Sequence, residues 1–183
     1  NSKNNENNEK VKNKNEESNT QANKMVAKKY PKEEFAATYR GYDVCAKLEI
    51  PAINLETNVL KNYSVSALNI SVTKFWGVEP NRIGNCCIAG HNFINKNMFR
   101  NLKKLKIGDK LFLTDKDVGK VEYEVFSIEK VSPKDVSCLE PVTYNEREVT
   151  LITCTLDSQK RIIVKAKEVW NFIKDKKLKW QIW

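Results

Sequence analysis

A cysteine, a histidine and an arginine are the residues of this chain best suited to acyl transfer. The chain contains five cysteines and a single histidine, His91. A thiolate is a strong nucleophile, but an ordinary thiol is mostly protonated at neutral pH, so another group must exchange its proton. Histidine does this near pH 7, and a guanidinium can stabilise the oxyanion of a tetrahedral intermediate. A lone histidine is also compatible with a purely structural role.

Cys154, His91 and Arg161 all lie where predicted strands begin or end. Cys154 comes late in the apolar segment EVTLITCTL, just before the polar turn DSQK, and Arg161 opens the next strand, RIIVKAKEV. His91 closes the short buried strand CCIAGH. A tight hairpin would bring Cys154 and Arg161 to one rim, and functional residues gather near loops. The three positions are therefore compatible with one site.

Short strands and tight turns fill most of the chain. CAKLEIPAINLETNVL predicts two strands, and KLFLTD and KVEYEVFSIEKV flank the turn DKDVG as a hairpin. SVSALNISV predicts one or two helical turns, and NKNMFRNLKKLKIGD a short helix stopped by Gly108. Many strands with few short helices predict a mainly β fold, a closed β-barrel.

One domain is expected from 183 residues. Residues 1–24 contain only Val11 and Ala22 as apolar residues, too few to offset the entropy of ordering the chain. A helix is predicted from Lys32 to about Thr38. The Trp-rich end of the chain is either a terminal helix or an interfacial segment. The predicted organisation is a disordered polar linker over 1–24, an N-terminal helical segment over 25–43, a β-barrel over 44–169 and an amphipathic tail over 170–183.

The basic charge gives little information about partners. The formal net charge is +9, but the lysines are scattered and form no aromatic and basic stripe, so we expect no nucleic-acid partner and a solvated surface instead. No apolar run approaches the roughly 20 residues that span a bilayer. We therefore expect membrane contact only through an N-terminal anchor segment that is absent from this chain.

Four of the five cysteines are expected to be small core residues, namely Cys45, Cys86, Cys87 and Cys138. An odd number of cysteines leaves at least one free thiol. No C-x-x-C pair is present, and one histidine supplies a zinc site poorly. We expect no metal site and no cofactor; no compact carboxylate cluster indicates calcium, which would have to be bound by ligands scattered over several loops.

Several motifs resemble those of the sortase family. TLITC at residues 150–154, with Arg161 seven positions after Cys154, resembles the TLxTC strand and its trailing arginine. IAGH at 88–91, preceded by Gly84 and Asn85, resembles the family's AGH segment. Weaker matches are LEIPAI at 48–53 and the segment from Met98-Phe99 through Leu102 to KIGD at 106–109. The resemblance covers roughly residues 44–169 in family order.

The resemblance implies an eight-stranded β-barrel and a transpeptidase. Sortases cut the Thr–Gly bond of an LPxTG-like sorting signal through a thioacyl enzyme, which an amine from a wall precursor or a pilin lysine resolves. The enzyme would work on the extracellular face of the cell membrane. The missing lid and the short connection before TLITC favour a housekeeping (class A) or class D-like enzyme.

The resemblance also implies roles for individual residues. Arg161 is preferred over its neighbour Lys160 for its planar donors and its match to the family spacing. The connection at about 132–148 would form one wall of the substrate groove. The implied catalytic residues are Cys154 as nucleophile, His91 as general acid/base and Arg161 as oxyanion stabiliser; the implied substrate-binding residues are Thr153, Ile152, Ala89 and Asn92.

Two alternatives compete with this interpretation. Another Cys/His peptidase is one, but the chain has no C-G-x-C-W or S-x-G-C-x-R segment, and papain-like chains place the cysteine before the histidine. A non-catalytic β-barrel binding module is the other, with Cys154 merely buried. The reactivity of the thiol distinguishes the binding module, because a buried structural cysteine is inert.

Overall fold

The computed structural model of the protein describes residues 34–92, 98–141 and 145–169. Its strands are β1 (Thr38–Tyr39), β2 (Tyr42–Ile50), β3 (Leu55–Leu60), β4 (Val72–Gly77), β5 (Gly84–Ala89), β6 (Lys110–Asp115), β7 (Gly119–Val131), β8 (Arg147–Cys154) and β9 (Arg161–Glu168). Its helices are the α-helix α2 (Val65–Ile70) and the 3-10 helices η1 (Pro51–Ile53), η2 (Phe99–Lys104) and η3 (Ser137–Leu139).

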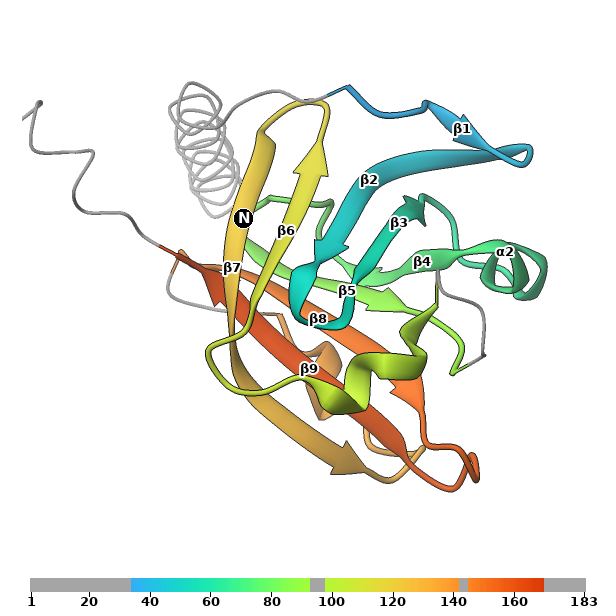
Figure 1. The fold of residues 1–183 in the computed structure, drawn as a ribbon, viewed down its shortest axis with the longest axis vertical. Helices are drawn as coiled ribbons and strands as arrows, with labels where there is room; N and C mark the ends of the chain where they lie inside the picture. Colours follow the sequence, from blue (N-terminus) through green and yellow to red (C-terminus); the bar gives the residue numbers. More distant parts are fainter. Residues whose placement is uncertain (1–33, 93–97, 142–144, 170–183) are drawn as a thin grey trace, which may run out of the picture.

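Eight of these strands close into a barrel, which confirms the predicted fold class (Figure 1). The order around the barrel is β2-β3-β4-β5-β8-β9-β7-β6, and β6 pairs back onto β2. The β3–β4 and β5–β8 pairs are parallel and the other pairs are antiparallel, so the barrel is mixed. Because β8 lies between β5 and β9, the end of β5, the end of β8 and the start of β9 are neighbours.

The barrel interior is filled by apolar side chains that alternate along the strands. In β2, for example, Ala46, Leu48 and Ile50 are buried while Lys47 and Glu49 are partly exposed, as the two-residue period of a strand requires. Full burial of such an aliphatic side chain contributes about 1.5–3 kcal/mol. The packed interior gives the strand ends a fixed frame.

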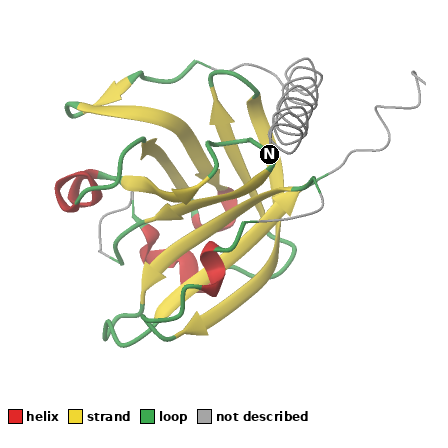
Figure 2. Ribbon diagram, turned by 180° about the vertical axis from the view of Figure 1, so that it is seen from behind, coloured by secondary structure: helices red, strands yellow, loops and turns green. Residues whose placement is uncertain are grey.

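The described helices are short and lie in the connections between strands (Figure 2). Helix α2 begins as predicted, with the Ser64 Oγ accepting a hydrogen bond of 3.0 Å from the Ala67 N–H. The predicted helix that ends at Gly108 is instead the 3-10 helix η2, which ends at Lys104. Phe99, Leu102 and Leu105 are all buried and lie three residues apart, the spacing that places side chains on one face of a 3-10 helix.

The helix expected from Lys32 to Thr38 is absent from its described part. Residues 34–37 have no helix, and Thr38–Tyr39 form β1, which pairs with β2. The φ angles of Arg40 and Gly41 are 48° and 82°. Two successive positive φ values make the tight turn of a β-hairpin, so the turn chemistry of Arg40-Gly41 overrides the helix-forming residues before it.

The predicted linker over 1–24 and the tail over 170–183 lie outside the described residues. In the described ranges, no helix is long and apolar enough to cross a bilayer. The barrel predicted over 44–169 begins slightly earlier, since β2 starts at Tyr42.

Candidate active site

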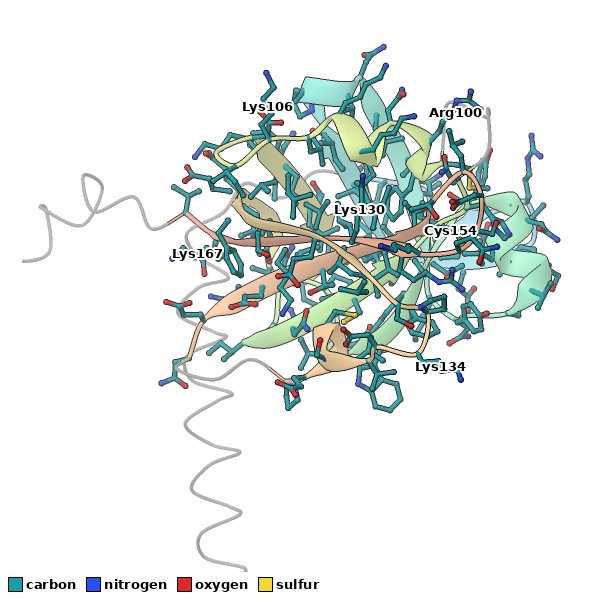
Figure 3. The ribbon with its side chains drawn as sticks, turned by 90° about the horizontal axis from the view of Figure 1, so that it is seen from below. Arg100, Lys106, Lys130, Lys134, Cys154 and Lys167 are labelled. Carbon is teal, nitrogen blue, oxygen red and sulfur yellow. The ribbon has the colours of Figure 1, made fainter. Side chains whose placement is uncertain are left out.

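Cys154 and Arg161 face each other across a hairpin. Cys154 is the last residue of β8, Arg161 is the first of β9, and the two are register partners. The turn between them is closed by a hydrogen bond from the Thr155 N–H to the Lys160 carbonyl (2.9 Å). Directly opposed residues of an antiparallel pair point to the same face. Cys154 is half-buried and lies at the end of its strand, away from the centre of the barrel (Figure 3).

The parallel pairing of β5 with β8 places His91 beside the end of β8. Ala89 is the register partner of Ile152, and the Gly90 N–H donates to the Ile152 carbonyl (3.0 Å). The Thr153 Oγ1 donates to the Gly90 carbonyl (2.8 Å). Gly90, the residue before His91, is therefore hydrogen-bonded to β8 through both its N–H and its carbonyl group.

Gly90 is required by the close approach of two side chains. A Cβ atom at this position would lie 2.7 Å from Phe99 Cδ2 and 2.8 Å from Val72 Cγ1. The Phe99 N–H also donates to the His91 carbonyl (3.0 Å), which ties η2 to the loop that carries the histidine. A glycine before His91 thus lets the end of β5 pack directly against the side chains of Phe99 and Val72.

The imidazole of His91 contacts the side chain of Asn69 in α2. His91 Nε2 lies 3.2 Å from Asn69 Oδ1. An amide oxygen only accepts hydrogen bonds, so this contact requires a protonated Nε2. Partial burial lowers the pKa of His91 below its usual value of 6.5, because desolvation disfavours the imidazolium. The ring is therefore mostly neutral at pH 7.

One pocket of about 330 Å³ contains all three candidate catalytic residues. Its polar side chains include His91, Asp135, Thr153, Cys154 and Arg161, and its walls are otherwise largely apolar. The apolar lining residues come from three places: Tyr63, Leu68 and Phe75 around α2 and β4; Ala89, Ile152 and Ile163 from β5, β8 and β9; and Pro133, Val136, Cys138 and Leu139 from the β7–β8 connection. A nucleophile, a proton-transfer group and a fixed cation thus share an apolar cleft.

The predicted substrate-binding residues divide into two groups. Ile152 and Ala89 line the pocket. Thr153 also contributes to the lining, but its side chain is buried and donates to Gly90. Asn92 is not among the lining residues; its Nδ2 donates to the Cys154 carbonyl (2.8 Å). Thr153 and Asn92 therefore position the backbone of the site.

Arg161 and Lys160 lie in different environments. Arg161 lines the pocket, whereas Lys160 belongs to the exposed turn before β9. The position of Lys160 in this turn keeps it out of the pocket. The Lys160 carbonyl accepts from both Thr155 and the Arg161 Nη1 (3.4 Å).

The other four cysteines are poor nucleophiles. Burial raises the pKa of Cys45 and Cys87 to about 12 in each case, and raises the pKa of Cys86 and Cys138 as well. All five cysteines are free thiols. Thiols that stay protonated at neutral pH do not attack carbonyl groups, so Cys154 is the candidate nucleophile.

A second cavity, of about 620 Å³, lies between the start of β2 and the β6–β7 turn. Carboxylates and cations line it together, including Asp115, Lys116 and Arg82. Its one thiol is Cys45, whose pKa is raised to about 12. A thiol that stays protonated is a poor nucleophile, so this cavity offers no thiolate for acyl transfer. In the described ranges, no group of three or more His, Cys, Asp or Glu residues could hold a metal ion.

Sequence reasoning missed Asn69 and Asn85. Asn69 contacts His91 from 22 positions earlier in the chain, and no local pattern signals such a contact. The motif that contains Asn85 gives no sign that its side chain joins β5 to the β7–β8 connection. The wall expected from residues 132–148 is present in its described part, where Pro133, Val136 and Leu139 line the pocket.

Comparison with known proteins gives one consistent family. The family model described as the Sortase domain matches residues 48–169. Sortase A of Bacillus anthracis is 33% identical over 127 residues, which are 66% of this chain and 58% of that protein. Sortase A of Listeria monocytogenes serovar 1/2a is 28% identical over 120 residues, or 65% of this chain and 53% of that protein. The matches thus span little more than half of these two relatives.

Solved structures agree with the sequence matches. A Clostridium perfringens Sortase D5 transpeptidase superposes with a TM-score of 0.63 at 29% identity, covering 82% of this chain and 89% of that one. A lid mutant of Sortase A from Corynebacterium diphtheriae, at 22% identity and a TM-score of 0.65 over 87% of this chain and 96% of that one, supports the fold alone.

Proposed function

The chain belongs to the sortase family of cysteine transpeptidases, and from that premise we propose that it cleaves an LPxTG-like sorting signal and transfers the new acyl group to an amine. The observation that carries this proposal is the single apolar pocket lined by His91, Cys154 and Arg161. An extended peptide laid along this pocket would present a backbone carbonyl to the thiol while burying apolar side chains against the walls.

In the proposed first step, the Cys154 sulfur attacks the carbonyl carbon of the threonine in the signal. His91 takes the proton of the Cys154 thiol as the sulfur attacks, and it delivers this proton to the leaving amine of the glycine when the C–N bond breaks. Arg161 stabilises the negative charge on the carbonyl oxygen of the tetrahedral intermediate. The product is a thioester between the substrate and Cys154.

In the proposed second step, an amine attacks the thioester and loses a proton to His91. The C–S bond breaks, the thiolate is regenerated, and a new amide bond joins the substrate to the acceptor. The acceptor is a wall precursor or a pilin lysine, and the reaction takes place at the extracellular face of the membrane. We propose a class A or class D-like enzyme, because the connection that precedes TLITC is short in the sequence.

The proposal is tested by incubating the protein with a panel of LPxTG-like peptides and an amine, followed by mass spectrometry. Cleavage between Thr and Gly, with a new amide to the added amine, is expected for at least one peptide. Cys154→Ala must remain folded and give neither product, and His91→Ala must fall by at least about 10²-fold. A parent protein whose Cys154 resists alkylation and which cleaves no peptide would support the binding-module alternative.

A further inference from the structure

Asn85 connects the barrel to the β7–β8 connection, which forms one wall of the pocket. It lies on β5 and is 2% exposed. Its Nδ2 donates to the carbonyl of Cys138 (2.9 Å) and to the carbonyl of Glu140 (3.1 Å). Both carbonyls belong to the β7–β8 connection, and they flank Leu139, which lines the pocket. One amide group therefore holds the chain on either side of a pocket residue.

A third hydrogen bond sets the orientation of this amide. The Thr150 Oγ1, on β8, lies 2.8 Å from Asn85 Oδ1 and donates to it. Because the oxygen is occupied by this hydroxyl, the NH₂ group must point at the two carbonyls of the wall. Thr150 is fully buried, so neither residue has water as a ready replacement partner.

The rest of the described wall is weakly attached to the barrel. Between residues 132 and 141, Cys138 is the buried residue and most of the others are exposed. Val136, for example, is 64% exposed although it lines the pocket. The Cys87 thiol also approaches the Cys138 carbonyl, at 3.8 Å, but a thiol is a weak donor. Among the residues that the structure describes, the amide of Asn85 is thus the main polar attachment of this segment to the barrel.

We propose that Asn85 is a positioning residue that fastens the wall segment 133–140 to β5 and thereby sets the width of the pocket beside Cys154. It touches no reacting atom. Loss of its NH₂ group leaves the carbonyls of Cys138 and Glu140 without these hydrogen bonds. The wall segment can then move away from β5. The effect on substrate binding rests on the proposed function, whereas the effect on the wall itself does not.

Asn81 offers a control with a matched set of side-chain hydrogen bonds. It is 1% exposed, its Nδ2 donates to the carbonyls of Leu113 and Gly119 (2.9 Å each), and its Oδ1 accepts from the Tyr123 hydroxyl (2.8 Å). The hydrogen-bond pattern is the same as that of Asn85, but its carbonyl partners lie in β6 and β7 and not in the pocket wall. Asn81→Ala removes a comparable set of buried hydrogen bonds away from the pocket.

The experiment compares Asn85→Ala and Asn81→Ala by amide hydrogen exchange and by peptide kinetics. The Leu139 and Glu140 amides, which donate to Val136 and Ser137, should exchange at least about 10-fold faster in Asn85→Ala and within about 2-fold of the parent in Asn81→Ala. The KM for a cleaved peptide should rise about 5- to 10-fold in Asn85→Ala, with kcat within about 3-fold, because the wall is loosened while the catalytic groups remain.

Unchanged exchange at Leu139 and Glu140 in Asn85→Ala would overturn the proposal, as would an equal rise in KM for both variants. Faster exchange in a protein whose parent cleaves no peptide would keep the attachment and reject the proposed function instead. If Asn85→Ala does not fold, Thr150→Val serves in its place. It removes only the hydroxyl that orients the amide, and it should accelerate exchange of the same two amides by about 3-fold or more.

Discussion

Cys154 and Arg161 lie opposite each other in the β8–β9 ladder, and they form the residue pair next to the turn. The pairing places the thiol and the guanidinium on one face of the sheet, and both line the same pocket. Since the turn of residues 155–160 is closed by its own hydrogen bonds, the separation of the two side chains is set by the strand register.

The first prediction concerns the shape of the cation. Arg161→Lys keeps the charge but loses the planar donors, and removal of one oxyanion donor typically lowers the rate by about 10²–10³. We expect Arg161→Lys to lose about 10-fold or more in kcat and Arg161→Ala at least as much. Lys160→Ala, in the adjacent exposed turn, should retain near-parental activity. An active Arg161→Ala with an inactive Lys160→Ala would show that the wrong cation has been assigned.

The second prediction concerns the selectivity of thiol modification. Iodoacetamide at pH 7.5 should label Cys154 first, because burial raises the pKa of the other four thiols, to about 12 for Cys45 and Cys87. Peptide mapping by mass spectrometry identifies the labelled residue. In Cys154→Ala the rapid phase should vanish; rapid labelling of Cys138 ahead of Cys154 would contradict the assignment of the nucleophile.

The third prediction concerns the link between β8 and the loop of His91. Thr153→Val removes the hydroxyl that donates to the Gly90 carbonyl at nearly constant volume. The free energy of unfolding should fall by about 1–3 kcal/mol, the usual loss when a buried hydrogen-bond partner is left unpaired. Thr153→Ser keeps the hydroxyl and should lose less. Urea unfolding measures both, and equal stability of Thr153→Val and the parent would contradict this role.

The fold was largely predictable because its signals are local. The turns DKDVG and DSQK separate segments of clear two-residue period, and these segments are the β6–β7 and β8–β9 hairpins. The short hairpin around Arg40 and Gly41 was missed, since positive φ values at a non-glycine residue are not visible in composition. The triplet spacing of Phe99, Leu102 and Leu105 also fits a 3-10 helix better than the predicted longer helix.

The candidate site was predictable only in part. Cys154 and Arg161 lie close in sequence, so a hairpin argument suffices to pair them. The contacts of Asn69 with His91 and of Asn85 with Cys138 join segments that are 22 and 53 positions apart, and they depend on the closed barrel. Asn92, predicted to meet the substrate, also donates to the Cys154 carbonyl, a contact that depends on tertiary packing and leaves no local pattern in the sequence.

The fourth prediction concerns the contact between Asn69 and His91. Asn69→Ala removes the acceptor that faces Nε2, so the ring loses one constraint on its tautomer and orientation. Activity should fall about 3- to 10-fold, well short of the loss of about 10²–10⁴ expected for His91→Ala. Ser66→Ala, also on α2 and exposed, is the control and should remain near parental activity. Equal activity of Asn69→Ala and Ser66→Ala would remove Asn69 from the site.

The fifth prediction concerns the titration of His91, which is the single histidine of the chain and so gives one unambiguous C2–H resonance in NMR. Desolvation lowers its pKa in the folded protein. Between the folded pKa and about 6.5, the unfolded chain binds more protons than the folded one. Stability should therefore decrease as the pH falls through this window, and His91→Gln should remove that part of the pH dependence.

The same titration distinguishes two electrostatic states of the site. A pKa below 6.5 means that burial dominates, so that the neutral ring is the resting form and can accept a proton from the thiol or from the incoming amine. A measured pKa above 6.5 would contradict the prediction, because it requires an anion beside the imidazolium, and the Cys154 thiolate would be the candidate. Repeating the titration in Cys154→Ala decides between these causes: a raised pKa that returns below 6.5 in this variant identifies the thiolate, and an unchanged one excludes it.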